Sequence, residues 1–435
     1  MLLLWCITTL LGAAEVDLPV AFTPTEQRRI LQHSPVPEPP DDPTNAWDLD
    51  PDAANLGQAL FYDAGFSRNG QVSCASCHGP MIAWTDGVPI STGMGPGKRH
   101  SQSLLNVAHN RWFFWDGRAD TLWSQAMHPV EDPAEFDGSR VDYVRRIHED
   151  PAYREAYESV FGDLPSMADT ARFPPGTRSG TPEWDAMTEA DRSHVDRVFV
   201  NCSKAIAAFE RELRSVDSPF DRFVEGLREG DREKMTALNS SEQRGLQLFV
   251  GEAGCRQCHS GPLFTDFEFH NIGIPTGHGG PPRDSGRFGG IEFVQASPFS
   301  SHGVHSDEPG GRKARRTGSI VKGQEHWGSF KTPSLRNVGR TAPYMHQGQF
   351  GDLATVLRFY NTLEDMQVQD HHQEAVLKPL DLTEQQLKDL EAFLRSLNSP
   401  LPSRSLMGPV DPRTGTPPQR AKKPIQPTSE SGKKP

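Results

Sequence analysis

This 435-residue chain has few cysteines, few long apolar runs and no excess of positive charge. Six cysteines are too few to suggest a disulfide-rich scaffold. The Leu-rich run within residues 1–14 is too short to cross a bilayer, so we expect no transmembrane segment. The formal net charge is −12, and an acidic body disfavours nucleic acid as a partner. Glycine and proline are abundant, at 39 and 37 residues, which predicts long irregular loops between regular elements.

The Leu-rich start of the chain has the features of an export signal. It ends in the small residues Gly12, Ala13 and Ala14 before Glu15, although the usual basic residues at its beginning are missing. We therefore expect a signal peptide over residues 1–14, cleaved near Ala14, and a mature protein in the periplasm. Residues 15–45 are interpreted as an N-terminal extension.

Four of the six cysteines form two C-x-x-C-H pentapeptides, at residues 74–78 and 255–259. Each offers two thiols for thioether bonds to haem vinyl groups and an adjacent histidine for the iron. A zinc site is disfavoured because the two pairs lie far apart and each has its own histidine. A thioredoxin-like redox pair is disfavoured because neither flank is rich in β-branched strand runs. The sequence predicts two covalently bound haem c groups, held by Cys74, Cys77, Cys255 and Cys258, with His78 and His259 on the irons.

The surroundings of the two pentapeptides repeat. Residues 57–61 before the first motif resemble residues 245–249 before the second, and residues 103–107 resemble residues 334–338. Each half closes with a similar amphipathic segment, and in the second the leucines at 387, 390, 394 and 397 follow helical spacing. These repeats predict a mainly α fold with two tandem class I cytochrome c-like domains, each with one covalent haem, over residues 46–225 and 236–400.

Three further features of the sequence concern residues outside the haem-binding motifs. Cys202 shares an apolar stripe with Ile206, Phe209 and Leu213, which predicts a buried hydrophobic position. Residues 276–326 are rich in Gly, Ser, Pro and Arg without periodicity and indicate a long surface loop. Residues 401–435 are rich in Pro, Lys and Arg and should be disordered.

Two more motifs, F-W-D-G-R at residues 114–118 and T-A-P-Y-M-H at residues 341–346, complete a wider resemblance. In this order the motifs resemble the bacterial di-haem cytochrome c peroxidase superfamily over about residues 46–400. The resemblance implies that the first haem is the peroxide site and the second relays electrons. It also implies that Trp115 lies between the haems and that Glu135, with Gln125 beside it, forms the acid-base side of the first haem.

The iron ligands on the side opposite the histidines indicate a branch of this family. A typical member has a histidine sixteen residues after the first haem histidine, whereas this chain has Met94 there, with His100 as an alternative ligand six residues on. At the position of the typical axial methionine of the second iron, this chain has Tyr360. Met345 and Met366 compete for that role on sequence alone. Together the two departures resemble the tyrosine-ligated, MauG-like branch, in which the first iron is open at rest.

Calcium is a further cofactor that the resemblance implies. Thr341 and Pro343 match the segment that provides calcium ligands, but His100 stands at the expected asparagine and is a poor ligand for a hard cation.

Three functions are compatible with the sequence. The first is reduction of hydrogen peroxide to water with electrons from a small periplasmic cytochrome c or copper protein. The second is MauG-like, peroxide-dependent oxidation of side chains in a partner protein. The third is non-catalytic electron transfer, which Glu135 and Gln125 beside an open haem disfavour.

Overall fold

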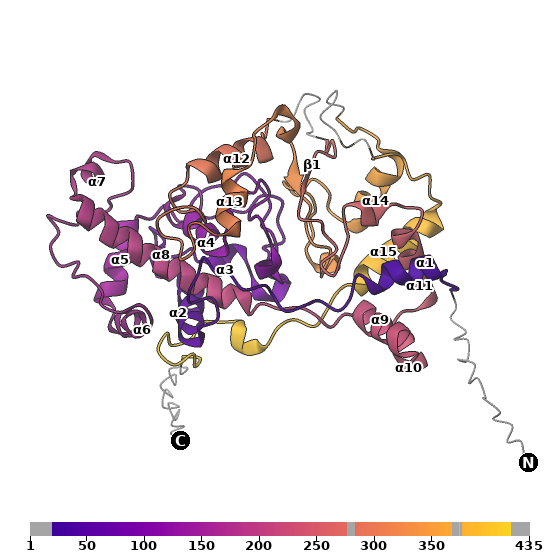
Figure 1. The fold of residues 1–435 in the computed structure, drawn as a ribbon, viewed down its shortest axis with the longest axis horizontal. Helices are drawn as coiled ribbons and strands as arrows, with labels where there is room; N and C mark the ends of the chain where they lie inside the picture. The colour runs from indigo at the N-terminus through magenta and orange to yellow at the C-terminus, as the bar shows by residue number, and fades with distance from the viewer. Residues whose placement is uncertain (1–19, 276–282, 368–373, 375, 419–435) are drawn as a thin grey trace, which may run out of the picture.

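The computed structural model describes residues 20–275, 283–367, 374 and 376–418. The expected signal peptide and residues 419–435 of the tail lie outside the described residues. Helices and irregular connections make up the described chain, with one short antiparallel pair of strands, β1 (Phe269–His270) and β2 (Phe330–Lys331) (Figure 1). The mainly α fold expected from the sequence is confirmed.

Most helices begin at an Asp, Asn, Ser or Thr whose side chain accepts hydrogen bonds from the first turn. The first half contains α1 (Pro24–Leu31), α2 (Pro51–Tyr62), α3 (Cys74–Cys77), α4 (Leu122–Glu131), α5 (Arg140–Glu149), α6 (Pro151–Phe161), α7 (Pro182–Ala186) and α8 (Glu189–Arg211). The second half contains α9 (Pro219–Glu229), α10 (Arg232–Met235), α11 (Ser240–Val250), α12 (Arg287–Ala296), α13 (Arg312–Gly318), α14 (Leu353–Thr362) and α15 (Glu384–Ser396).

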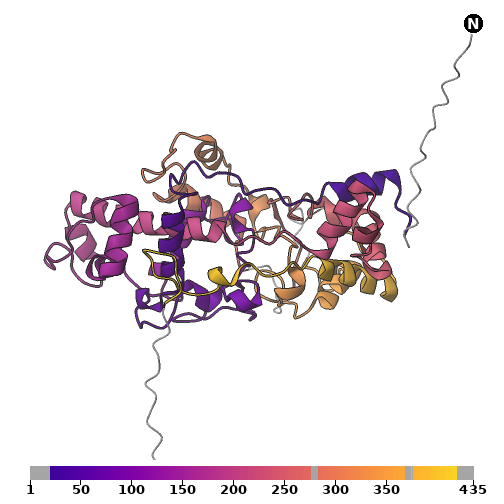
Figure 2. The same cartoon turned by 90° about the horizontal axis from the view of Figure 1, so that it is seen from below.

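Two hydrophobic cores hold these elements together. The first is formed largely by α2, α4, α5, α6 and α8, and the second by α9, α11, α14 and α15. Two lobes are visible from the front and from below (Figures 1 and 2). As predicted, Cys202 is buried in the first core and the leucines of α15 are buried in the second.

The repeat seen in the sequence reflects one helix crossing used twice. In the first lobe α2 crosses α8, and a Cβ added at Gly57 would lie 1.9 Å from the carbonyl oxygen of Ala205. In the second lobe α11 crosses α15, and a Cβ at Gly245 would lie 1.9 Å from the carbonyl oxygen of Asp389. Only glycine permits backbones to approach so closely. The two glycines of the repeated segments therefore fix equivalent helix pairs.

An asparagine performs the same task in each copy of the other repeated segment. Asn106 and Asn337 both adopt left-handed backbone conformations, with φ of 59° and 61°. The amide of Asn106 donates to the carbonyl oxygen of Ser215 and accepts from its N–H, at 2.8 and 2.9 Å. The side chain of Asn337 accepts from the N–H of Ser399 at 2.9 Å. Each asparagine thus ties a haem-binding loop to the chain that leaves the closing helix of its lobe.

The boundaries between the lobes differ from the predicted limits. Helix α9 begins inside the predicted first domain of residues 46–225, yet Phe220 and Phe223 are buried in the second core. Helix α1, from the predicted N-terminal extension, buries Ile30 in the same core. Amphipathic patterns show that these helices bury one face, but they do not show against which lobe.

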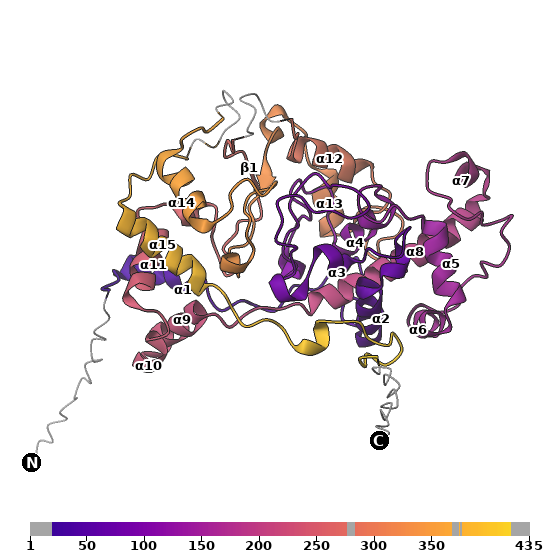
Figure 3. The ribbon, with the colours of Figure 1, turned by 180° about the vertical axis from the view of Figure 1, so that it is seen from behind.

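The segment after α15 also differs from its prediction. Residues 401–418 were expected to belong to a disordered tail, but the chain returns from α15 to the first lobe (Figure 3). The Gln58 amide on α2 donates to the carbonyl oxygens of Ser405 and Gly408, at 2.6 and 2.8 Å, and Val410 is buried in the first core. Residues 401–418 contain prolines and basic residues, and yet a few apolar side chains hold them against the first lobe.

The predicted surface loop over residues 276–326 contains two helices, α12 and α13. They lie against the first lobe, where the buried carboxylate of Asp120 accepts hydrogen bonds from Ser301 and Thr317. The sequence pattern missed them because both helices are short and rich in Gly or Arg. Among the described residues, no helix is long and apolar enough to span a membrane.

Candidate active site

A cavity of about 1080 Å³ lies between the two lobes and is lined by residues of both pentapeptides. Cys77 and His78 line it from the first lobe, and Cys255, Cys258 and His259 line it from the second. The walls also contain apolar side chains from α11, α14 and α15. The cavity therefore joins the two predicted haem positions in one space.

The first pentapeptide folds as the short helix α3, which places His78 directly after it. The His78 Nδ1–H donates to the carbonyl oxygen of Trp84 at 3.1 Å, and the Ser101 hydroxyl lies 3.2 Å from the same nitrogen. The Ser101 hydroxyl in turn donates to the Cys77 carbonyl at 2.6 Å. Holding Nδ1 in this way fixes the ring and leaves Nε2 as the atom for a metal.

The second pentapeptide repeats this arrangement. The His259 Nδ1–H donates to the carbonyl oxygen of Phe264 at 2.9 Å. The backbone N–H of each haem histidine donates to the carbonyl of the first cysteine of its own motif, Cys74 or Cys255, at 2.9 Å. All four motif cysteines are free of disulfides. Paired free thiols and an oriented imidazole at one cavity are the donor set that haem c requires.

A carboxyl and an amide from the first lobe border the cavity on the first-haem side. Burial, reinforced by the negative charge of Asp132 and opposed by Arg118, raises the pKa of Glu135 to about 7. Glu135 lies close enough for its charge to act on the Cys74 and Cys77 thiols. The side-chain oxygen of Gln125, on α4, is buried without a hydrogen-bond partner in the described structure. Both predicted residues thus line the cavity with polar atoms free for a ligand.

Trp115 lies at the same cavity and is nearly buried. Its indole N–H donates to the carbonyl oxygen of His100 at 2.9 Å, and its own carbonyl accepts from the backbone N–H of Lys331 at 2.8 Å. Lys331, on β2, belongs to the second half of the chain. The tryptophan is therefore fixed at the contact between the two lobes.

Lys331 is a cavity residue that the sequence reasoning missed. Its side chain is 3% exposed, and burial lowers its pKa to about 8. It lines the cavity near Trp115. Nothing in its local pattern distinguishes it from surface lysines, because the burial comes from the meeting of the lobes.

Tyr360 lies on α14, with its side chain at the cavity beside the second pentapeptide. Burial, reinforced by the neighbouring Cys255 and Cys258, raises the pKa of the Tyr360 phenol well above its usual range. Of the two competing methionines, Met345 also lines the cavity, whereas Met366 packs near Gly273. The phenol oxygen needs a cation such as iron to favour its anionic form at neutral pH.

The two alternative ligands for the first iron occupy different places. Met94 packs against the first core and is not among the cavity-lining residues, and its N–H donates to the Glu135 carbonyl at 2.9 Å. His100 does line the cavity, and its Nδ1–H donates to the Val88 carbonyl at 2.7 Å. Met94 thus supports the backbone of Glu135, and His100 is the better placed of the two.

Thr341 and Pro343, the residues matched to a calcium site, both line the cavity. Across the described ranges, the one cluster of three acidic, histidine or cysteine ligands is Cys258, Asp266 and His270. Cys258 belongs to the haem motif, and the imidazole of His270 lies 2.8 Å from an oxygen of Asp266. Calcium at Thr341 and Pro343 stays a prediction.

Comparison with known proteins places this geometry in a family. A family model described as di-haem cytochrome c peroxidase matches residues 51–229. The methylamine utilization protein MauG of Methylorubrum extorquens is 32% identical over 399 residues, with 91% of each chain covered. The chain belongs to the di-haem cytochrome c peroxidase family. Its members include the cytochrome-c peroxidase IdrP1 of Pseudomonas sp. (strain SCT), which is 33% identical and covered over 84% of each chain.

A solved structure agrees with this assignment. A MauG-like protein associated with microbial copper homeostasis superimposes with a TM-score of 0.61 and 26% identity, covering 86% of this chain and 96% of that one. As a member of the di-haem cytochrome c peroxidase family, the protein is an oxidoreductase of the peroxidase type and carries two covalently bound c-type haems. The fold class and the two haem groups expected from the sequence are thereby confirmed.

Proposed function

We propose that the protein reduces hydrogen peroxide to water at the first haem, with electrons from a small periplasmic cytochrome c or copper protein. Hydrogen peroxide takes up two electrons and two protons and leaves as two waters. The bound haems supply the electron transfer. The observation that carries the proposal is Glu135, a buried carboxyl whose pKa of about 7 lets it both accept and donate a proton near neutral pH.

The side chains around the cavity have separate tasks in this proposal. Glu135 takes the proton from the oxygen that binds and returns it to the oxygen that leaves, while Gln125 orients peroxide through its free side-chain oxygen. Trp115 passes oxidising equivalents between the lobes. Tyr360 would provide the second protein ligand of the second haem iron, where an anionic phenolate would favour the oxidised metal.

A second function, peroxide-dependent oxidation of side chains in a partner protein, is favoured by one specific observation. Tyr360 lines the cavity beside the second haem motif, as the tyrosine-ligated branch requires, and MauG is among the relatives. The two functions use the same peroxide site and differ only in the source of the electrons. A cytochrome or copper donor gives turnover without modification of the donor, whereas a protein substrate keeps an oxidised side chain.

Substitution of Glu135 tests the shared step. We expect Glu135→Gln to slow peroxide consumption by about 10² or more, because it removes the proton-accepting group and keeps the size of the side chain. Glu158→Gln on the exposed face of α6 is the control and should leave the rate unchanged. Unchanged turnover in the Glu135 variant, with both haems in place, would remove this carboxyl from the reaction.

A further inference from the structure

Trp112 and Trp115 lie three residues apart in the chain but have different neighbours. Trp115 lines the haem cavity, whereas Trp112 is 5% exposed and does not line it, although its chain neighbour Phe113 does. Both indoles are oxidisable groups close to a site that handles a strong oxidant. The neighbours of each ring decide which of them is oxidised.

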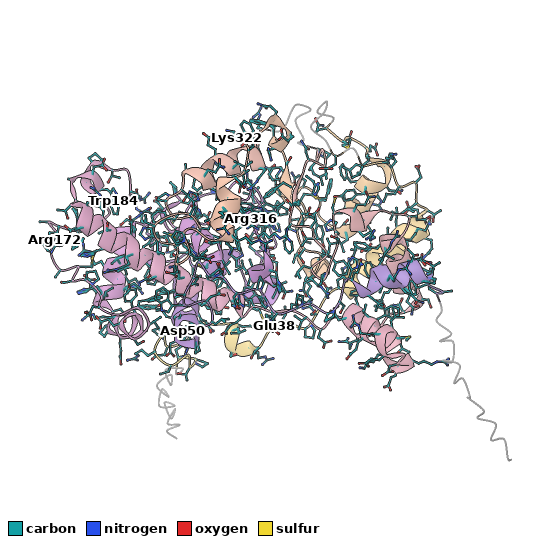
Figure 4. All side chains as sticks on the ribbon, viewed as in Figure 1. Glu38, Asp50, Arg172, Trp184, Arg316 and Lys322 are labelled. Atoms are coloured by element: carbon teal, nitrogen blue, oxygen red, sulfur yellow. The ribbon has the colours of Figure 1, made fainter. Side chains whose placement is uncertain are left out.

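Two arginines from the non-repeated segment over residues 276–326 lie against Trp112. The guanidinium of Arg287, on α12, is 4.2 Å from the centre of the Trp112 ring, and that of Arg316, on α13, is 4.8 Å from it. Arg287 is buried and donates to the carbonyl oxygen of Gly117 at 2.7 Å. Arg316 donates to the carbonyl oxygen of Arg111 at 3.1 Å, and Figure 4 labels it on α13.

The charge on these arginines is retained at neutral pH. Burial lowers the pKa of Arg287 to about 10, which is still well above 7, and Arg316 is also shifted downward by burial. Asp116, Glu268 and Asp120 lie near enough for their negative charges to act on Arg287, but each also has a partner of its own. Asp116 pairs with Arg99 at 2.6 Å, Glu268 lies 3.7 Å from Arg111, and Asp120 accepts hydrogen bonds from Ser301 and Thr317.

Removal of an electron from an indole leaves a positive charge on the ring. A cation that was attracted to the neutral ring then repels it, and the repulsion is strong where the ring is buried. Trp112 has two such cations. Among the residues that the structure describes, no arginine or lysine lies over the Trp115 ring, and its N–H points to a carbonyl oxygen.

We propose that Arg287 and Arg316 keep oxidising equivalents off Trp112 and so confine them to Trp115 and the haem cavity. The inference rests on the proposed function, because peroxide is the oxidant that generates those equivalents. The step prevented is transfer of two electrons, one at a time, from the Trp112 indole to the oxidised site, with loss of two protons and addition of a hydroxyl oxygen from water to the ring. Helices α12 and α13 thereby acquire a role in directing the oxidation.

The test removes one guanidinium charge. Arg316 is only partly buried, so Arg316→Gln should fold, while Arg316→Lys keeps a positive charge. Arg315→Gln is the matched control on the same helix, since Arg315 is exposed and its guanidinium donates to the nearby Gly310 carbonyl. Each holoprotein is treated with hydrogen peroxide without an electron donor, and oxygen addition at residues 112 and 115 is measured by peptide mass spectrometry.

We expect about tenfold more oxidation of Trp112 in Arg316→Gln than in the wild type, with little change in Arg316→Lys and Arg315→Gln. Measurable but equal oxidation of Trp112 in the wild type and Arg316→Gln would overturn the proposal. So would a wild type in which Trp112 is oxidised as readily as Trp115.

A second arm separates this proposal from the proposed function. A flash-generated ruthenium(III) tris-bipyridine complex oxidises tryptophan by electron transfer and needs no peroxide. The same ranking of variants in this arm, with no oxidation in the peroxide arm, would support the role of the arginines and contradict peroxide chemistry at the haems. Equal yields at Trp112 in this arm, including none in either protein, would overturn the proposal.

Discussion

The two lobes share the elements that hold the haem motifs and differ in the polar side chains that they present to the cavity. Gly57 and Gly245 permit the same helix crossing, and His78 and His259 are oriented by the same backbone hydrogen bond. Across the cavity, the first lobe presents the carboxyl of Glu135 and the second lobe presents the phenol of Tyr360. Duplication thus kept what attaches and orients the haem, while the opposite face of each site diverged toward a different task.

The pH dependence of the peroxide reaction provides the largest expected difference between the lobes. Because burial raises the pKa of Glu135 to about 7, its carboxylate is present above that pH and lost below it. The rate should therefore fall about tenfold per pH unit below about 6, and the fall should be absent in Glu135→Gln. Stopped-flow measurement of the rate of reaction with peroxide between about pH 5 and about pH 9 gives the profile.

Asp132 offers a finer version of this measurement. Its negative charge raises the pKa of Glu135, so Asp132→Asn should move the midpoint of the profile downward by about half a unit to one unit. A midpoint that stays in place, or moves upward, would show that another group sets the profile.

Replacement of Tyr360 tests the second lobe. Tyr360→Met exchanges an anionic oxygen ligand for a thioether, which favours reduced iron, so the potential of the second haem should rise by on the order of 0.1 V. Spectroelectrochemical titration measures both haems at once. The first haem is the internal control, and a second haem with unchanged potential and spectrum would contradict ligation by Tyr360.

The smallest expected effect is on stability, and it tests the helix crossing that the two lobes share. Gly57→Ala and Gly245→Ala each place a methyl group against a backbone carbonyl, so each should lower the free energy of unfolding by about 1–3 kcal/mol. Gly351→Ala is the control, because a Cβ added there meets no atom within 4 Å. Gly162 is unsuitable as a control because its φ of 82° strains any other residue. Thermal unfolding of the holoproteins checks whether the two crossings are equivalent. A loss of stability in only one of the two variants would show that the two glycines are not equivalent.

The sequence predicted the features that depend on local chemistry. The spacing of Cys74, Cys77 and His78 identifies a haem site without any tertiary information, and the leucine spacing in residues 384–396 identifies one buried helix face. The place of Glu135 came from resemblance, since the neighbouring acids Glu131 and Asp132 have the same local appearance. The structure separates Glu131 from Glu135, because Glu131 pairs with Arg140 at 2.5 Å, whereas Asp132 lines the cavity together with Glu135.

The features that the sequence did not predict depend on contacts between distant segments. Lys331 is buried only because β2 meets Trp115 from the other lobe. The arginines over Trp112 come from a segment that has no periodic pattern, and their role appears only when α12 and α13 lie on the first lobe. Local periodicity describes one face of an element and leaves its partner undefined.

Addition of hydrogen peroxide to the as-purified ferric protein, followed by stopped-flow absorption spectroscopy, tests the central claim most directly. An open first iron beside Glu135 predicts an immediate change in the haem bands without prior reduction, and a slower change in Glu135→Gln. No change until a reductant is added would contradict the account, and would indicate a closed first iron with a sixth ligand such as His100.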